Sequence, residues 1–190
     1  MTIPRELIGA FRRSGLILNG RRMVDYADVI WLQTPEWFVD MRLLIPGLPA
    51  PAATDVPAWF YQEKAFAGIA SWAPPTITWQ HLIDSHLRTT PDSNPLSWED
   101  GVVIERGITD LDGTPTPFAE EWLRMTGDDV EYSAEHDENR ARARIVVGRF
   151  AVEISDDRPT GGNFRATRLE KRDGEWIEYG SVVVDRKSVV

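Results

Sequence analysis

The segment from Val29 to Arg42 reads VIWLQTPEWFVDMR and decides the fold. Its two halves are rich in β-branched and aromatic residues, which favour strands. Pro35 and Glu36 separate the halves, and proline suits the second position of a turn because its φ angle is already fixed. The segment therefore predicts an antiparallel hairpin with a two-residue turn.

The short turn also fixes which residues of the hairpin face each other. Trp31 is expected opposite Asp40, and Leu32 opposite Val39. One face of the hairpin is then apolar and consists of Ile30, Leu32, Trp37, Val39 and Met41. The other face mixes aromatic, polar and charged groups and consists of Val29, Trp31, Gln33, Phe38, Asp40 and Arg42. A mixed face of this kind indicates either a wet pocket or a seam between two barrels.

Further strand patterns follow along the chain. Strand pairs are predicted at residues 65–72 and 76–84, at 140–147 and 150–155, and at 164–171 and 175–184, with another strand at 101–109. Gly and Pro turn signals separate the members of each pair. Few windows hold a helical apolar spacing without a Gly or Pro break. We therefore expect an all-β chain with little helix, folded into antiparallel β-barrels.

Two proline-containing stretches punctuate the strands. Residues 45–56 contain several prolines, each of which removes a ladder donor, so this stretch is predicted to be a long connection. Such a connection is either a linker or a lid over a site. Residues 91–97 are predicted to form the boundary between two halves of the chain.

An internal repeat supports the division into halves. Residues 37–42 align with residues 150–155, with aromatic, apolar and acidic positions in the same order. In the second copy Arg144 is expected opposite Glu153, on a face that water solvates. The alignment predicts two similar barrels, at residues 1–96 and 97–190. Because the first copy places Trp31 against Asp40 where the second places Arg144 against Glu153, we expect the first barrel to carry the site and the second to be a scaffold. The alternative is chance similarity between two amphipathic strand sets.

Composition limits the classes of partner and the compartment. The 190 residues carry a net charge of -9, which disfavours binding to nucleic acid and to anionic membranes. No stretch approaches the roughly 20 apolar residues of a spanning helix, and residues 1–10 lack the pattern of a signal peptide. The chain has no cysteine. A protein without disulfides suits a reducing compartment, so we expect a cytoplasmic location.

Sequence motifs for cofactor chemistry are absent. There is no Gly-x-Ser-x-Gly nucleophile motif, and Gly161-Gly162 lacks the spacing of a phosphate-binding or dinucleotide-binding loop. His81 and His86 point to opposite faces of an extended strand, which disfavours a metal pair. We therefore expect neither a cofactor nor a metal.

The segment Val29 to Arg42 also carries a family resemblance. Together with Leu7 to Arg13 before it, and with Phe66-Ala67-Gly68 and Trp79-Gln80-His81 after it, it resembles the Hri family of fungal and bacterial proteins. In the second half the matches are Glu105-Arg106-Gly107 and Glu121-Trp122. The resemblance implies two tandem lipocalin-like β-barrels in a cytosolic protein, and it implies no catalytic residue.

His81 is the first candidate for chemistry in a barrel pocket. Alternation along residues 76–84 places it on one face with Ile77, Trp79 and Ile83. Beside Trp79, a histidine can act as a pocket base or as a hydrogen-bond donor, because its pKa lies near neutrality. The alternative is a core histidine with satisfied hydrogen bonds.

Asp40 and Glu105 are the candidate carboxyl groups. A carboxyl group buried beside aromatic rings can have a raised pKa that suits proton transfer. The alternative is that both form structural ion pairs, Asp40 with Arg42 and Glu105 with Arg106.

The sequence favours a binding protein that takes a small apolar or aromatic molecule into a barrel. The expected ligand-binding residues are Trp31, Gln33, Phe38, Asp40, Arg42, Trp72, Trp79, His81 and Glu105. A second hypothesis is a cofactor-free enzyme, such as an isomerase, cyclase or hydratase, with His81, Asp40 or Glu105 transferring protons. A third is a protein-interaction module with a filled barrel and an exposed aromatic surface. The first two require a partly polar cavity, whereas the third requires none.

Overall fold

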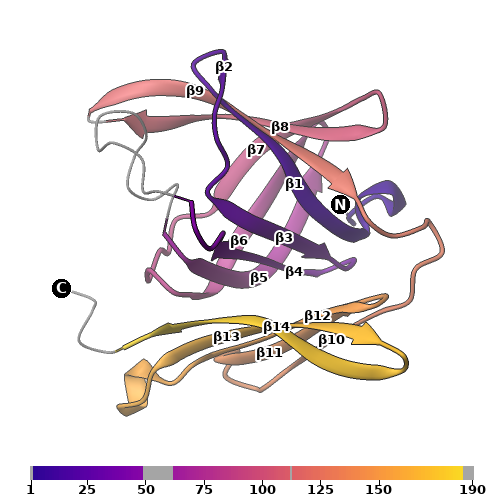
Figure 1. Cartoon of the computed structure of the whole chain (residues 1–190), viewed down its shortest axis with the longest axis vertical. Helices are drawn as coiled ribbons and strands as arrows, with labels where there is room; N and C mark the ends of the chain where they lie inside the picture. The colour runs from indigo at the N-terminus through magenta and orange to yellow at the C-terminus, as the bar shows by residue number, and fades with distance from the viewer. Residues whose placement is uncertain (1, 49–61, 112, 186–190) are drawn as a thin grey trace.

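The computed structural model describes residues 2–48, 62–111 and 113–185, and in these ranges the chain is all-β (Figure 1). The first nine strands are β1 (Gly9–Leu18), β2 (Arg21–Arg22), β3 (Ala27–Gln33), β4 (Trp37–Leu44), β5 (Lys64–Ala73), β6 (Thr76–Asp84), β7 (Asp92–Glu99), β8 (Val102–Leu111) and β9 (Thr114–Arg124). The last five are β10 (Tyr132–His136), β11 (Arg142–Val147), β12 (Phe150–Asp156), β13 (Phe164–Arg172) and β14 (Glu175–Val184). Among the described residues the helical segments are single 3-10 turns, η1 (Arg5–Leu7) and η3 (Arg158–Thr160). Within these ranges no helix has the length and apolar character needed to cross a membrane. The predicted connection at 45–56 lies largely outside the described residues.

The first nine strands form a closed antiparallel barrel. Strands β1 and β3 to β9 are neighbours in that order, and β9 pairs back with β1, which closes a ring of eight strands. The short strand β2 pairs with the end of β1. In the central hairpin Trp31 pairs with Asp40 and Leu32 with Val39, which confirms the predicted register.

The last five strands form a separate open sheet. Strands β10 to β14 pair in sequence order, each antiparallel to the next. Arg144 pairs with Glu153 as predicted, and their side chains form an exposed ion pair at 2.6 Å. In Figure 1 this sheet, drawn in orange to yellow, covers one side of the barrel.

The strand pairing differs from the expected pair of barrels with a boundary at residues 96 and 97. That boundary falls inside β7, and β8 and β9 complete the first barrel, so residues 91–97 do not separate two units. The aligned hairpins are both amphipathic, but alternation only assigns residues to faces and does not specify whether a sheet closes. Closure here depends on pairing between β1 and β9, which are far apart in the sequence.

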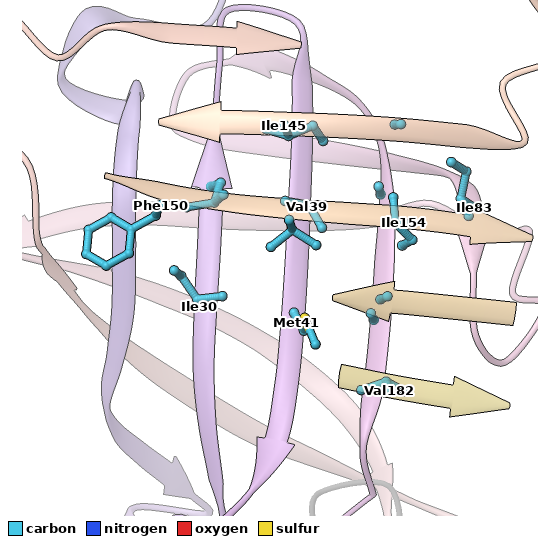
Figure 2. Close-up of a cluster of buried hydrophobic side chains, with 14 of the residues drawn as sticks. Ile30, Val39, Met41, Ile83, Ile145, Phe150, Ile154 and Val182 are labelled. Carbon is cyan, nitrogen blue, oxygen red and sulfur yellow. The ribbon is translucent and has the colours of Figure 1, made fainter. Parts of the chain in front are cut away.

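The apolar face of the central hairpin packs against the open sheet. Figure 2 shows Ile30, Val39 and Met41 of the barrel meeting Ile145 and Phe150 of the sheet. This core cluster also contains Leu32, Trp37, Val147, Val152, Ile154, Phe164, Ala166 and Val182. The apolar face is therefore the seam between the two parts, while the mixed face lines the barrel interior.

Aromatic side chains fill much of the barrel interior. The ring of Trp31 stacks on Phe11 at 4.6 Å and meets Trp79 and Trp122 edge-on, each at 5.6 Å. Leu7 of the N-terminal turn belongs to the same cluster. It lies near the end of the barrel where Gly9 of β1 pairs with Gln33 of β3, so this end is closed by packed side chains.

A bulge in β6 changes the faces predicted for residues 76–84. Ala67 pairs with Ile83 while Gly68 pairs with His81, so Leu82 is the extra residue. Trp79 and His81 face the interior, whereas Ile83 belongs to the seam, contrary to the expectation of one shared face. Gly68 is required at this position because a side-chain carbon would lie 1.9 Å from the Gln80 carbonyl oxygen.

We expect Phe150→Ala to destabilise the whole chain by about 3–5 kcal/mol, since this ring is buried in the core shared by barrel and sheet. Urea unfolding followed by tryptophan fluorescence and by circular dichroism would measure the loss. Val183→Ala is the control, because Val183 is exposed on the same sheet and its truncation should change stability by less than about 0.5 kcal/mol. A loss below about 1 kcal/mol for Phe150→Ala would contradict the shared core.

Candidate functional site

A cavity of ≈600 Å³ lies at the end of the barrel away from Leu7, and we call it the outer cavity. Its walls are formed by Arg42, Gln62, Lys64, Phe66, His86, Arg88, Pro91, Asp92, Ser93, Asn94, Glu105, Ile108, Thr109, Phe118 and Glu120. A smaller space of ≈40 Å³, the inner chamber, is lined by Trp31, Phe38, Asp40, Arg42, Phe66, Trp79, Asp92, Glu105 and Trp122. Four residues line both spaces, so the two are adjacent: Arg42, Phe66, Asp92 and Glu105.

Two buried carboxyl groups face each other across β8 and β9 in the wall of the outer cavity. Glu105 pairs directly with Glu120. The Glu105 oxygens accept hydrogen bonds from Asn94 Nδ2 at 2.8 Å and from Trp122 Nε1 at 3.1 Å. Burial and the charge of Glu120 raise the pKa of Glu105 to about 8. Glu105 therefore carries a proton at neutral pH.

Glu120 remains ionised because basic residues surround it. Arg13 Nη1 donates a hydrogen bond to Glu120 Oε1 at 2.7 Å. Although burial opposes ionisation, the positive charges of Arg13 and Arg42 lower the pKa of Glu120. The cavity wall thus holds two neighbouring carboxyl groups in different protonation states, an arrangement that suits acid–base chemistry.

Arg42 and Trp79, which line the inner chamber, each carry a buried N–H group without an acceptor among the described residues. Arg42 Nε donates to Asp40 Oδ1 at 2.9 Å, which confirms that predicted ion pair. Its Nη1 lies 3.6 Å from Glu120 Oε1, beyond hydrogen-bonding distance. Within the described residues neither Arg42 Nη1 nor Trp79 Nε1 has a hydrogen-bond partner. Both groups are therefore suited to an acceptor atom of a ligand.

His81 is packed inside the barrel against Phe66 but lines neither space, which agrees with the alternative of a core histidine with satisfied hydrogen bonds rather than with a pocket base. Its Nδ1 is 2.6 Å from Asp84 Oδ2, its Nε2 is 3.1 Å from Asp92 Oδ2, and its ring stacks on Phe66 at 4.4 Å. Although burial opposes the charge, hydrogen bonds to the two carboxylates raise the pKa of His81. Because carboxylates engage both ring nitrogens, His81 positions Asp92 and Phe66 and does not itself face either space.

Most of the residues expected at the site converge on the inner chamber, and Gln33, Trp72 and His81 are the exceptions. The Gln33 amide accepts from Trp31 Nε1 and donates to the Thr34 carbonyl, so it supports the hairpin turn. Trp72 is half-buried and packs edge-on against Trp98.

The expected ion pair between Glu105 and Arg106 does not form. Arg106 donates to Ser97 and Glu99 on the outer surface, because neighbouring residues of a strand point to opposite faces.

The sequence analysis did not identify four polar residues that line the outer cavity: Lys64, Asp92, Asn94 and Glu120. Strands β7 and β9 were not recognised as barrel strands, so their inward residues were not considered. The alternation of Thr116, Phe118, Glu120 and Trp122 is the signal in β9 that could have revealed Glu120.

No group of three or more histidine and acidic side chains suited to a metal ion occurs in the part of the chain that the structure describes. Comparison of the chain with family models, curated proteins and solved structures finds no match. The resemblance to the Hri family therefore stays a prediction, and the site is interpreted from its geometry.

We expect Glu105→Gln to gain stability relative to the wild type as the pH rises from 5 to 8. The Glu105 pKa is about 8 in the folded protein and about 4.5 ordinarily, so the folded state retains a proton that the unfolded chain releases in this window. The wild type therefore loses stability as the pH rises, by on the order of a few kcal/mol, and the amide removes this loss. Urea unfolding at both pH values measures the difference.

Glu99→Gln is the matched control for this experiment. Glu99 is exposed, and its hydrogen bond from Arg106 lowers its pKa, so its contribution is constant above pH 5. If the free energy of unfolding of Glu105→Gln differed from that of the wild type by the same amount at pH 5 and at pH 8, Glu105 would be ionised in the folded protein.

Proposed function

We propose that this protein binds a small aromatic or apolar molecule that carries a hydrogen-bond acceptor. The outer cavity of ≈600 Å³, which adjoins the aromatic inner chamber, is the observation that carries the proposal. Its volume falls within the range of ordinary ligand pockets. A barrel of eight strands has room for one such molecule.

The lining of the two spaces supports an amphipathic ligand. Phe66, Ile108 and Phe118 offer apolar contact in the outer cavity. The inner chamber has room for a group about the size of a water molecule, next to the N–H donors of Arg42 and Trp79. A carbonyl or hydroxyl oxygen is a group of that size that accepts hydrogen bonds.

The cavity favours this function over a protein-interaction module, for which the barrel would be filled. None of the residues that line these two spaces belongs to the open sheet. This supports the hypothesis that the first part of the chain carries the site and that the second part is a scaffold. The sequential antiparallel pairing of the barrel is also that of lipocalins. The lipocalin-like description and the relation to the Hri family are part of this proposal.

Trp79→Phe should weaken the binding of ligands with an acceptor by about 3- to 10-fold, the usual worth of one hydrogen bond. The substitution keeps a six-membered aromatic ring, and it removes the N–H donor, which has no acceptor among the described residues, together with the smaller ring of the indole. Binding of benzoate and cinnamyl alcohol is measured by quenching of tryptophan fluorescence. Trp72→Phe is the matched control, since Trp72 lines neither space. Absence of saturable binding of small aromatic molecules to the wild type would contradict the proposal.

A second candidate function is a cofactor-free enzyme that transfers protons, such as an isomerase, cyclase or hydratase. The protonated Glu105 beside the ionised Glu120 is the observation that favours it. His81 and Asp40 are not favoured as proton carriers, because both ring nitrogens of His81 are engaged by carboxylates and Asp40 is paired with Arg42.

Catalysis by Glu105 predicts that Glu105→Gln slows turnover by at least about 100-fold while ligands still bind. Compounds that bind are incubated with the protein in D₂O, and NMR spectroscopy measures deuterium incorporation or conversion to an isomer. Trp72→Phe again serves as control and should retain the wild-type rate. Equal rates for Glu105→Gln and the wild type would exclude Glu105 as the proton donor.

A further inference from the structure

Arg158 connects the open sheet with the end of β6 in the barrel. It lies in η3, between β12 and β13, and only 6% of its surface is exposed. Its Nη2 donates to the Asp84 carbonyl oxygen at 2.6 Å, and its Nη1 donates to the Ser85 carbonyl oxygen at 2.8 Å. Figure 2 shows Ile83, the preceding residue of β6, among the side chains of the shared core. Arg158 therefore adds a polar connection between the two parts of the chain to their apolar contact.

The guanidinium of Arg158 is fixed from the side of the sheet. Its Nε donates to Asp156 Oδ1 and its Nη2 to Asp156 Oδ2, each at 2.7 Å. The ring of Phe164, which belongs to the shared core, lies 5.2 Å from the guanidinium carbon. Because a guanidinium is planar and presents its N–H groups in fixed directions, the bidentate ion pair also sets the direction of the two bonds to the barrel.

The loop between β6 and β7 forms part of the wall of the outer cavity. His86 and Arg88 of this loop line the cavity, as does Asp92 at the start of β7. The Asp84 carboxylate accepts hydrogen bonds from the His86 backbone N–H at 2.7 Å and from Arg88 Nε at 3.2 Å. It also binds His81, whose other ring nitrogen binds Asp92. Asp84 thus organises this part of the wall, and its own carbonyl group is bound by the open sheet.

The conformation of the loop requires support from its surroundings. Leu87 has a φ angle of 56°, which lies in the left-handed region that residues other than glycine rarely adopt. Its N–H donates at 3.2 Å to the Asp84 carbonyl oxygen, the same atom that accepts from Arg158. Ser85 is bonded to Ala65 of β5 through its N–H at 3.0 Å and its hydroxyl at 3.2 Å. The start of the loop is therefore held by β5 on one side and by Arg158 on the other, and such contacts are what maintain a strained backbone.

We propose that Arg158 is a positioning residue for the outer cavity. Its two bonds to the end of β6 hold the loop between β6 and β7, and thereby place His86 and Arg88 in the cavity wall. The effect on ligand affinity rests on the proposed function, whereas the effect on the loop does not. The open sheet then has a role beyond covering an apolar surface, because it fixes the shape of a cavity that it does not line.

Arg158→Gln removes the charged donor, and amide hydrogen exchange followed by NMR on the full chain measures the effect on the loop. The backbone N–H groups of Ser85, His86 and Leu87 should exchange at least about tenfold faster than in the wild type, because two hydrogen bonds from a charged group are lost. Asp156→Asn is a milder variant, which keeps Arg158 but weakens its ion pair. It should accelerate exchange of the same amides to a smaller extent, and it decides the question if Arg158→Gln does not fold.

Arg168→Gln is the matched control. Arg168 is also buried in the open sheet and also binds the barrel, since its Nη1 donates to Asp28 at 3.0 Å. Asp28, however, lines neither the outer cavity nor the inner chamber. Urea unfolding should show a loss of stability comparable with that of Arg158→Gln, while exchange of the loop amides stays close to that of the wild type.

Binding of cinnamyl alcohol separates this inference from the proposed function. Its affinity should fall at least about threefold in Arg158→Gln and stay that of the wild type in Arg168→Gln, because only the first variant displaces the cavity wall. Loop exchange no faster in Arg158→Gln than in Arg168→Gln would overturn the inference, and so would faster exchange with unchanged affinity. Absence of saturable binding to the wild type would overturn the proposed function, and the exchange rates alone would then decide whether Arg158 holds the cavity wall.

Discussion

The pairing of β1 with β9 is the contact on which the rest of the barrel depends. It closes the ring of strands, so neither strand is left with an unpaired edge in the barrel wall. The same pairing brings Arg13 of β1 to Glu120 of β9, where their side chains form an ion pair at 2.7 Å. Because the barrel is closed, the mixed face of the central hairpin lies inside it and lines its interior. Without it, Asp40 and Arg42 would lie on an open, solvated sheet.

Enclosure gives the charged groups of the interior their chemical character. A buried ion pair gains little net stability, because desolvation offsets the attraction between the charges. The interior nevertheless contains Arg13, Arg42 and Glu120 together with a protonated Glu105 and the amine of Lys64. Apolar residues in these positions would fill the barrel without the cost of desolvating charged groups. The retention of a polar cavity against this tendency is consistent with a ligand or a reaction that uses it.

The open sheet covers an apolar surface on the outside of the closed barrel. The central hairpin is apolar on its outer face, and exposing that face to water would be unfavourable. The sheet covers it with its own apolar face, and the two faces share one core. The central strands of the barrel wall are thereby buried on both sides, which limits the movement of Asp40 and Arg42 at the inner chamber. The sheet thus supports the site without contributing to its lining.

The sequence by itself determined the central hairpin, its register and its two faces. A two-residue turn fixes which residues oppose each other, and alternation with a period of two then assigns each side chain to a face. Trp31, Phe38, Asp40 and Arg42 could therefore be predicted as a group. Trp79 was predicted from alternation along residues 76–84, and Glu105 was proposed separately as a partly buried acid. Only the tertiary structure decided that the first sheet closes and the second stays open, that the bulge at Leu82 separates His81 from Ile83, and that Glu105 faces Glu120 rather than Arg106. Closure depends on the pairing of β1 with β9, which are not adjacent in the sequence, and a local pattern of alternation carries no information about which distant strand completes a sheet. The bulge and the pair of Glu105 with Glu120 lie in hairpins of consecutive strands, β5 with β6 and β8 with β9. Alternation assumes an unbroken period of two, so it does not reveal an extra residue, and the partner of Glu105 depends on the register of a hairpin whose second strand was not recognised.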